Sequence, residues 1–167
     1  MSELDSAATL PADRRDNMTN KDVRAIEKKF GIKLPGTYCQ LITNLPPYLE
    51  ALLLRDAKDG CESQIPFFLD RGMVEWTNGL VRGDEDDVYF EFDPNDDERP
   101  WPDDYFVIGS DVGGNYYCLK PATKTDRVYF WEQGCTSFMK YSQNIAGMVK
   151  KQFKLYSDLT QMDLQST

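Results

Sequence analysis

Carboxylate side chains are concentrated in one part of this chain. Residues 84–104 contain eleven carboxylates and one cation, Arg99, so this acidic segment has a formal charge of −10. The whole chain has a formal charge of −9, which leaves +1 for all the other residues together. Such a segment attracts basic proteins, raises their association rates and repels the phosphates of nucleic acids. The chemistry that it suits is electrostatic binding of a basic partner.

Aromatic residues are interleaved with these acids. Tyr89 and Trp101 accompany the acidic segment, and aromatic side chains that are removed from water supply much of the affinity of protein interfaces. We predict partner-binding residues among both kinds. They are Asp84, Glu85, Asp86, Asp87, Tyr89, Glu91, Asp93, Asp96, Asp97, Glu98, Trp101, Asp103 and Asp104. The alternative is a solvated acidic loop that only aids solubility.

The acidic segment also contains a partial match to a calcium-binding loop. Asp93, Asn95 and Asp97 have the alternating spacing of the first EF-hand ligands, and Asp104 falls at the last ligand position. Glu98 replaces the glycine that the loop requires, and prolines interrupt it. We therefore predict no metal site.

Catalytic equipment is sparse in this sequence. The chain has no histidine, which removes the most common general base and metal ligand. Carboxylate pairs such as Asp103 with Asp104, or Glu91 with Glu132, have the chemistry of a glycosidase, but nothing in the sequence brings a pair to a cleft. We predict a protein that is not an enzyme and has no catalytic residues or cofactors, with a carboxylate-based hydrolase as the weakest alternative.

A glycine-rich stretch, residues 109–114, superficially resembles a phosphate-binding loop. No predicted helix follows it, and no Lys-Ser or Lys-Thr pair closes it. We interpret it as the turn of a β-hairpin, in which glycine supplies a positive φ angle. The apolar runs on both sides of the turn predict strands that are covered on both faces and lie in the middle of a sheet.

The elements that position these residues are predicted from hydrophobic spacing and from capping residues. Helices are expected at 20–30, around 38–42 and at 73–81, and an edge strand at 65–69. The apolar run at 48–55 fits either a buried helix or a strand, and we favour a helix. Further strands are expected at 88–92, 105–108, 116–119 and 127–131. The apolar residues from Phe138 to Tyr156 keep a 3.6-residue period, which predicts one long C-terminal helix.

This order of elements predicts an α+β fold with a single domain. An antiparallel sheet of at least four strands would pack against the N-terminal helices and the long C-terminal helix. Residues 1–18 are expected to form a mobile tail, 19–160 the domain and 161–167 a second tail. The four cysteines are far apart, and no signal peptide or membrane-length apolar run is present, so we expect a cytoplasmic protein that does not bind membranes.

Four short stretches together resemble the SUKH superfamily, the Smi/Knr-like domains. They are Ile26–Pro35, Trp101-Pro102 before Phe106–Gly109, Gly113–Tyr117 and Val128–Trp131. The resemblance implies an α+β domain without catalysis. One departure is that Glu132 and Gln133 stand where many members have an Asp-His pair.

Many bacterial members of that superfamily are immunity proteins, so the resemblance implies a chain that binds and neutralises a cognate toxin domain. We expect the toxin to be basic, such as a nuclease or deaminase, and the free immunity protein to be a monomer. The alternative within the same fold is an intracellular adaptor or regulatory module with another protein partner.

Overall fold

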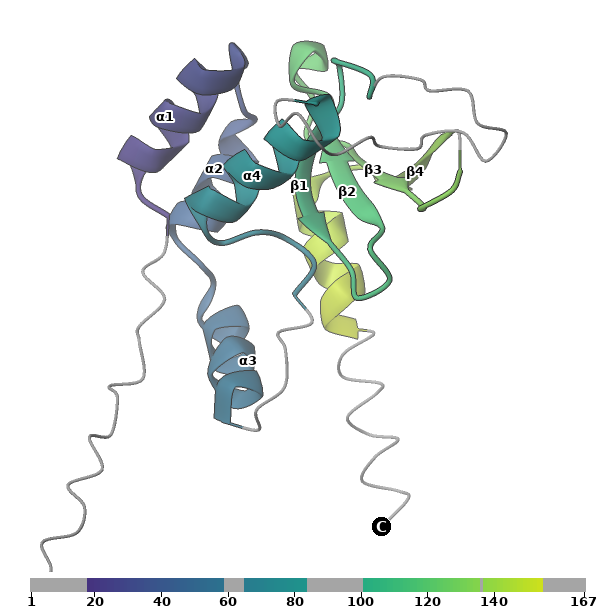
Figure 1. The fold of residues 1–167 in the computed structure, drawn as a ribbon. Coiled ribbons are helices and arrows are strands. Elements are labelled where there is room, and N and C mark those ends of the chain that lie inside the picture. Colours follow the sequence, from purple (N-terminus) through teal and green to yellow (C-terminus); the bar gives the residue numbers. More distant parts are fainter. Residues whose placement is uncertain (1–17, 59–64, 84–100, 136, 155–167) are drawn as a thin grey trace, which may run out of the picture.

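The computed structural model describes residues 18–58, 65–83, 101–135 and 137–154, and for 53–58 the backbone alone. Helices precede a four-stranded antiparallel sheet of order β1-β2-β3-β4 (Figure 1), which confirms the predicted α+β class. A last helix follows at 145–154. The other elements are α1 (Asn20–Phe30), α2 (Gly36–Thr43), α3 (Pro47–Lys58), α4 (Arg71–Arg82), β1 (Phe106–Ser110), β2 (Tyr116–Leu119), η1 (Pro121–Thr123), β3 (Val128–Trp131) and β4 (Phe138–Ser142).

Helices α1 and α4 begin and end at the residues that helix-capping chemistry favours. Thr19 and Asp22 form a reciprocal capping box at the start of α1, and Asp70 accepts a hydrogen bond from the Met73 amide at the start of α4. Gly31 and Gly83 end the two helices with positive φ angles, which glycine adopts without steric cost. The predicted helices at 20–30 and 73–81 are thereby confirmed.

The C-terminal helix begins later in the chain than the apolar spacing predicts. Residues Phe138–Ser142 form strand β4, which pairs with β3, and Gly134 makes the intervening turn with a φ of 83°. The last helix starts after Asn144, whose side chain accepts a 2.7 Å hydrogen bond from the Gly147 amide. The apolar spacing of Phe138, Tyr141 and Ile145 fits a helix by chance, because the first two residues belong to the strand and the third to the helix.

The segment 65–69 lies against β1 without forming the predicted regular strand. Its one backbone bond to β1 runs from the Phe68 amide to the Ile108 carbonyl, 2.8 Å apart. At Gly109 a Cβ atom would lie 1.6 Å from the Pro66 carbonyl oxygen, so only glycine allows this close approach. The predicted strand 88–92 falls outside the described residues, and β1 is an edge strand of the described sheet rather than a central one.

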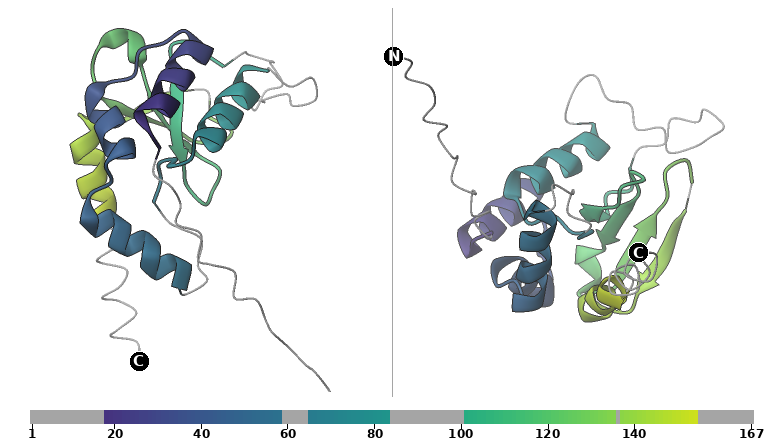
Figure 2. Two further views of the ribbon diagram at one scale, coloured as in Figure 1. Left: turned by 90° about the vertical axis from the view of Figure 1, so that its left-hand side faces the viewer. Right: turned by 90° about the horizontal axis from the view of Figure 1, so that it is seen from below.

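Both faces of the sheet are nonetheless covered. One face packs against α1, α2 and the last helix through a large apolar cluster that includes Ile26, Tyr38 and Met148 (Figure 2). The other face carries a smaller cluster built on Val107, Trp131 and neighbouring aromatic residues. This two-sided burial explains why β1 and β2 are apolar at nearly every position.

Helix α4 is bound to the outer edge of β1, which faces away from β2, by one buried amide side chain. The Asn78 Oδ1 atom accepts from the Val107 amide at 2.9 Å, and its Nδ2 atom donates to the Val107 carbonyl at 2.7 Å. The Arg82 guanidinium donates to Asn78 Oδ1 and to the Tyr105 carbonyl, at 2.8 and 2.9 Å. Asn78 therefore gives β1 the two hydrogen bonds that a further strand would otherwise supply.

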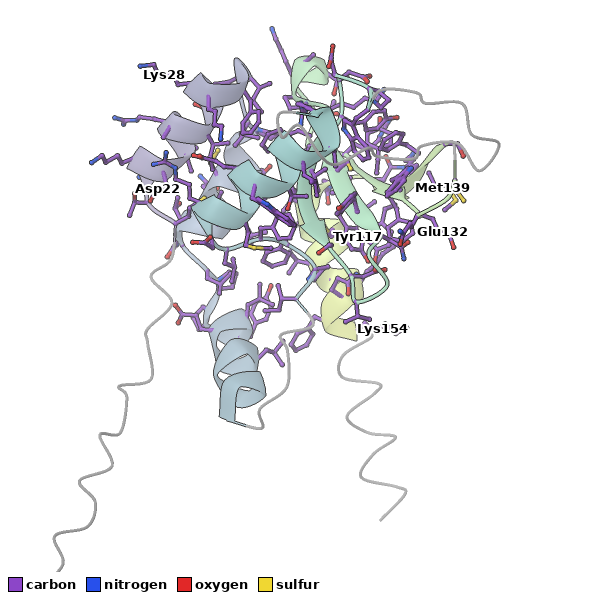
Figure 3. The ribbon with its side chains drawn as sticks, viewed as in Figure 1. Asp22, Lys28, Tyr117, Glu132, Met139 and Lys154 are labelled. Carbon is purple, nitrogen blue, oxygen red and sulfur yellow. The ribbon has the colours of Figure 1, made fainter. Side chains whose placement is uncertain are left out.

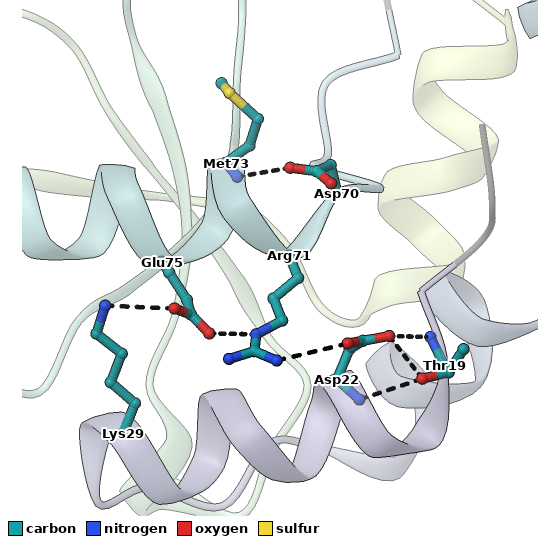
Figure 4. Close-up of polar contacts among 7 residues, drawn as sticks. All are labelled: Thr19, Asp22, Lys29, Asp70, Arg71, Met73 and Glu75. Atoms are coloured by element: carbon teal, nitrogen blue, oxygen red, sulfur yellow. Dashed lines mark hydrogen bonds and ion pairs between the residues drawn. The ribbon is translucent and has the colours of Figure 1, made fainter. Parts of the chain in front are cut away.

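A second link joins α4 to α1 through charged side chains (Figure 4). Glu75 accepts from Arg71 and from Lys29, the latter at 3.3 Å, and Arg71 also lies 3.7 Å from the Asp22 carboxylate. The hydrogen bond from Arg71 lowers the pKa of Glu75 below its ordinary value of 4.5. The hydrogen bonds from Thr19 lower the pKa of Asp22 in the same direction.

Among the described residues, no helix has the length and apolar character needed to cross a membrane.

Replacing Asn78 by alanine leaves the amide and carbonyl of Val107 buried without partners. Since an unsatisfied buried group costs about 1–3 kcal/mol, we expect Asn78→Ala to lower the free energy of unfolding by roughly 3 kcal/mol. Urea unfolding measures this loss. The neighbouring exposed substitution Trp76→Ala serves as the control and should change stability by less than about 0.5 kcal/mol.

Acid should weaken the link between α1 and α4. Because the folded state lowers the pKa values of Glu75 and Asp22, their stabilisation is complete above the unfolded pKa values and is lost as pH falls through the folded ones. We expect urea midpoints to fall between about pH 5 and about pH 3, and to fall less steeply in Glu75→Gln. Equal slopes in the two proteins would contradict this account.

Candidate partner-binding surface

Most of the predicted partner-binding residues lie outside the described part of the chain. Three are described: Trp101, Asp103 and Asp104, in the turn that leads into β1. Those outside it are Asp84, Glu85, Asp86, Asp87, Tyr89, Glu91, Asp93, Asp96, Asp97 and Glu98. Asp93, Asn95 and Asp97, which form the partial match to a calcium-binding loop, also lie there.

The turn at residues 101–105 is held by hydrogen bonds to one carbonyl. The Trp101 Nε1 atom donates to the Tyr105 carbonyl oxygen at 3.0 Å, and this oxygen also accepts from Arg82. The Tyr105 amide in turn donates to the Pro102 carbonyl at 3.0 Å. Asp103 and Asp104 are exposed at the tip of this turn, as a partner-binding role requires.

Trp101 differs from the expectation that it lies at the surface. Its side chain is 4% exposed and contacts the rings of Tyr116, Trp131 and Phe138 edge to face, at centroid distances of 5.1–6.0 Å. An indole with a satisfied N–H group and three ring neighbours is a core side chain. In this structure it packs beneath the acidic turn and is almost wholly buried.

Lysine 120 joins the turn to the sheet. The Lys120 ammonium lies 2.6 Å from the Asp104 carboxylate and stands over the ring of Tyr105, 4.2 Å from its centroid, and near that of Tyr129. The hydrogen bond with Asp104 raises the pKa of Lys120, so its charge is held at neutral pH. Asp104 is thus partly neutralised, whereas Asp103 makes no ion pair with any described residue.

Beneath the acidic turn, six aromatic side chains cover one face of the sheet. Tyr105 stacks on Phe138 with a centroid distance of 3.6 Å, and Tyr116 stacks on Trp131 at 5.5 Å. Four of the six are partly exposed, and burial raises the pKa values of Tyr105 and Tyr116, so both hydroxyls are neutral at physiological pH. We call this set the aromatic face: Trp101, Tyr105, Tyr116, Tyr129, Trp131 and Phe138.

The sequence interpretation did not assign Tyr105, Tyr116 and Tyr129 to a surface. A two-residue period would have found the last two, because Tyr116 and Cys118 share a face, as do Tyr129 and Trp131. The paired register places Tyr116 opposite Trp131, and Cys118 opposite Tyr129. The pattern was hidden because the alternate residues of β2 are equally apolar.

Metal-ligating side chains and cysteine thiols are the potentially reactive groups considered in the described residues. No cluster of three metal-ligating side chains occurs in this part of the chain. Cys39, Cys118 and Cys135 are free thiols, and burial raises the pKa of the Cys118 and Cys39 thiols, which makes both poor nucleophiles. Glu132 is exposed directly after the end of β3 (Figure 3). Glu91, the other member of the carboxylate pair considered above, lies outside the described residues.

The hairpin tip is a structural turn, as interpreted. Asp111 accepts hydrogen bonds from the amides of Gly113 and Asn115, and Gly114 has a φ of 79°. These bonds close the loop on itself, so its amide groups do not converge on an external anion. Val112 is the most exposed apolar residue of the tip.

A comparison with protein-family models matches residues 17–151 to the model described as SMI1 / KNR4 family (SUKH-1). The match covers α1 to the last helix and includes the turn at 101–105 and the whole aromatic face. Comparisons with curated proteins and with solved structures found no match.

The burial of Trp101 predicts a stability effect. Trp101→Ala should lower the free energy of unfolding by about 3–5 kcal/mol, because it leaves a large cavity under the acidic turn. Asp103→Asn, two residues away and exposed, should change stability by less than about 0.5 kcal/mol. Chemical denaturation of both variants measures the difference. A Trp101→Ala protein as stable as the parent would place this side chain outside the core.

Proposed function

The chain belongs to the SMI1/KNR4 family (SUKH-1), and we propose that it is an immunity protein that binds a cognate toxin domain and blocks it stoichiometrically. The SUKH family is known for immunity proteins of toxin systems, which supports this class of function. The finer assignment, a basic toxin such as a nuclease or deaminase, rests on the charge of the chain itself.

The observation that carries the proposal is the concentration of charge at one place in the sequence. Residues 84–104 sum to −10 while the rest of the chain sums to +1. The part of this segment that the structure describes presents Asp103 and Asp104 at an exposed turn, above an aromatic face. Enzymes that act on nucleic acids surround their active sites with basic residues, and an acidic surface is complementary to such a site.

Neutralisation would then proceed by occlusion. The acidic segment steers the toxin into contact, and contact with apolar side chains keeps it bound after water is displaced. No catalytic group, cofactor or metal is needed for this, and repulsion by net charge favours a free monomer. The proposed site of action is the cytoplasm, where Cys39, Cys118 and Cys135 would remain thiols.

The test is charge reversal with a matched control. Asp84, Glu85, Asp86 and Asp87 are changed together to lysine, and binding of candidate toxin domains encoded by neighbouring genes is measured by surface plasmon resonance, together with protection of toxin-expressing cells. The association rate constant should fall on the order of tenfold or more, most strongly at low salt.

The control changes the same number of charges elsewhere. Glu3, Asp5, Asp13 and Asp16 lie outside the family match, and their reversal to lysine alters net charge equally. This variant should bind and protect like the parent protein. Equal losses in both variants would show a net-charge effect, and no loss in either would remove the acidic segment from the interface.

A further inference from the structure

Helix α4 carries an apolar stripe on its outer side. Met73, Trp76 and Leu80 follow one another at spacings of three and four residues, which places them on one line along the helix. Met73 is 44% exposed, Trp76 is 52% exposed and Leu80 is partly exposed. Three neighbouring large apolar side chains at the surface are unusual for a helix whose opposite side is fully packed.

The other sides of α4 already have their partners. Val74, Asn78 and Val81 are buried against the sheet. Glu75 and Arg71 face α1, and Figure 4 shows the Met73 side chain directed to the opposite side of the helix from this ion-pair network. The outer stripe is therefore not required to hold α4 in place.

Trp76 stands apart from the other tryptophans of the chain. Trp101 and Trp131 are 4% and 1% exposed, and each donates its Nε1 hydrogen to a backbone carbonyl. Trp76 makes no ring contact and no side-chain hydrogen bond with the described residues. Exposed tryptophan is the side chain most enriched at the energetic centres of protein interfaces.

The charge around the C-terminal end of α4 indicates what kind of partner fits the stripe. The Arg82 guanidinium bonds the Tyr105 carbonyl at 2.9 Å, so this end of the helix adjoins the turn that exposes Asp103. In the sequence, the acidic segment begins directly after the cap residue Gly83. An apolar stripe that ends near the exposed Asp103 and is followed in the sequence by an acidic segment complements an apolar surface rimmed by Lys and Arg.

We propose that Met73, Trp76 and Leu80 form the apolar anchor of the interface, inserted into a hydrophobic depression that basic residues surround on the partner protein. This inference rests on the proposed function in taking the partner to be a basic toxin domain, and it adds the surface that holds the complex together. A second copy of this chain is a poor occupant, because each copy has a net charge of −9 and the two would repel each other.

The first experiment uses a probe of the stated chemistry and needs no toxin. A helical peptide built only from Leu and Lys is titrated into the full chain while tryptophan emission is recorded. Binding should shift the emission to shorter wavelength, because Trp76 is the exposed indole and would leave water. A peptide of Leu and Glu should produce no shift, and binding of both peptides alike would overturn the basic occupant.

Variants locate the binding site on the chain. Trp76→Ala and Met73→Ala should weaken binding of the Leu-Lys peptide on the order of 30-fold for the tryptophan and less for the methionine, and Trp76→Phe should retain most of it. Calorimetry measures all variants, including those without an indole signal. Circular dichroism and urea unfolding should match the parent protein.

The matched controls remove equally exposed apolar side chains from other surfaces. Met139, which is 49% exposed, lies on β4 at the opposite edge of the sheet from α4 (Figure 3), and Phe153 is 43% exposed on the last helix. Met139→Ala and Phe153→Ala should bind the peptide like the parent protein. Equal weakening in controls and stripe variants would overturn the proposal, as would dimerisation of the parent chain that Trp76→Ala abolishes.

The same variants are then tested for binding to candidate toxin domains encoded by neighbouring genes. Weaker binding by Trp76→Ala with unchanged binding by Phe153→Ala would support both proposals. If Trp76→Ala binds the toxin as well as the parent protein does, the proposal that the stripe anchors the interface is wrong, whereas the proposed immunity function is unaffected. Peptide binding through the stripe without any toxin binding would overturn the immunity function and leave the surface standing.

Discussion

The fold depends on how the hydrogen-bonding groups at the outer edge of β1, which faces away from β2, are satisfied. An edge strand presents unpaired amide and carbonyl groups, and those of Val107 are buried, where a missing partner costs about 1–3 kcal/mol for each group. A neighbouring helix cannot pair with a strand through its backbone, since its own amides are used internally. The Asn78 side chain solves this by presenting one acceptor and one donor, at 2.9 and 2.7 Å, to both groups of one residue. This pair of bonds fixes the position and the rotation of α4 at the same time.

Fixing the rotation of α4 decides what each of its sides does. With Asn78 against β1, Val74 joins the large apolar cluster, Val81 joins the smaller one, and Arg82 reaches the carbonyl of Tyr105. The same rotation turns Met73, Trp76 and Leu80 outward. The exposed stripe is thus a geometric consequence of the buried amide, and a substitution in the stripe leaves the bonds that hold the helix intact.

Much of this arrangement follows from local sequence, and the rest depends on contacts between distant residues. The start of α1 and the ends of α1 and α4 were predictable because Thr19, Gly31 and Gly83 act within a few residues of their positions, whereas the cap Asp70 at the start of α4 was not identified. Strand β4 was not predictable from local sequence, because Phe138 and Tyr141 form a strand only by pairing with β3. Trp101 was placed with the acidic segment on the basis of its neighbours in sequence, whereas its ring contacts come from β2, β3 and β4. The exposure of Trp76 was not predictable from the sequence, because a tryptophan on an amphipathic helix is ordinarily assigned to the core.

The anchoring of the two flanks of the acidic segment links charge to the α4 stripe. Arg82, just before the segment's first aspartate, and Trp101, near its end, both donate to the carbonyl oxygen of Tyr105, at 2.9 and 3.0 Å. The chain therefore leaves α4 and returns to the sheet at one place, which adjoins the end of the apolar stripe. Charge acts over about 8–10 Å at physiological salt, whereas apolar contact acts only after water is displaced. In the complex that we propose, the negative charge near the C-terminal end of α4, of which the structure describes Asp103, would determine how fast the partner arrives, and the apolar stripe would determine how long it stays.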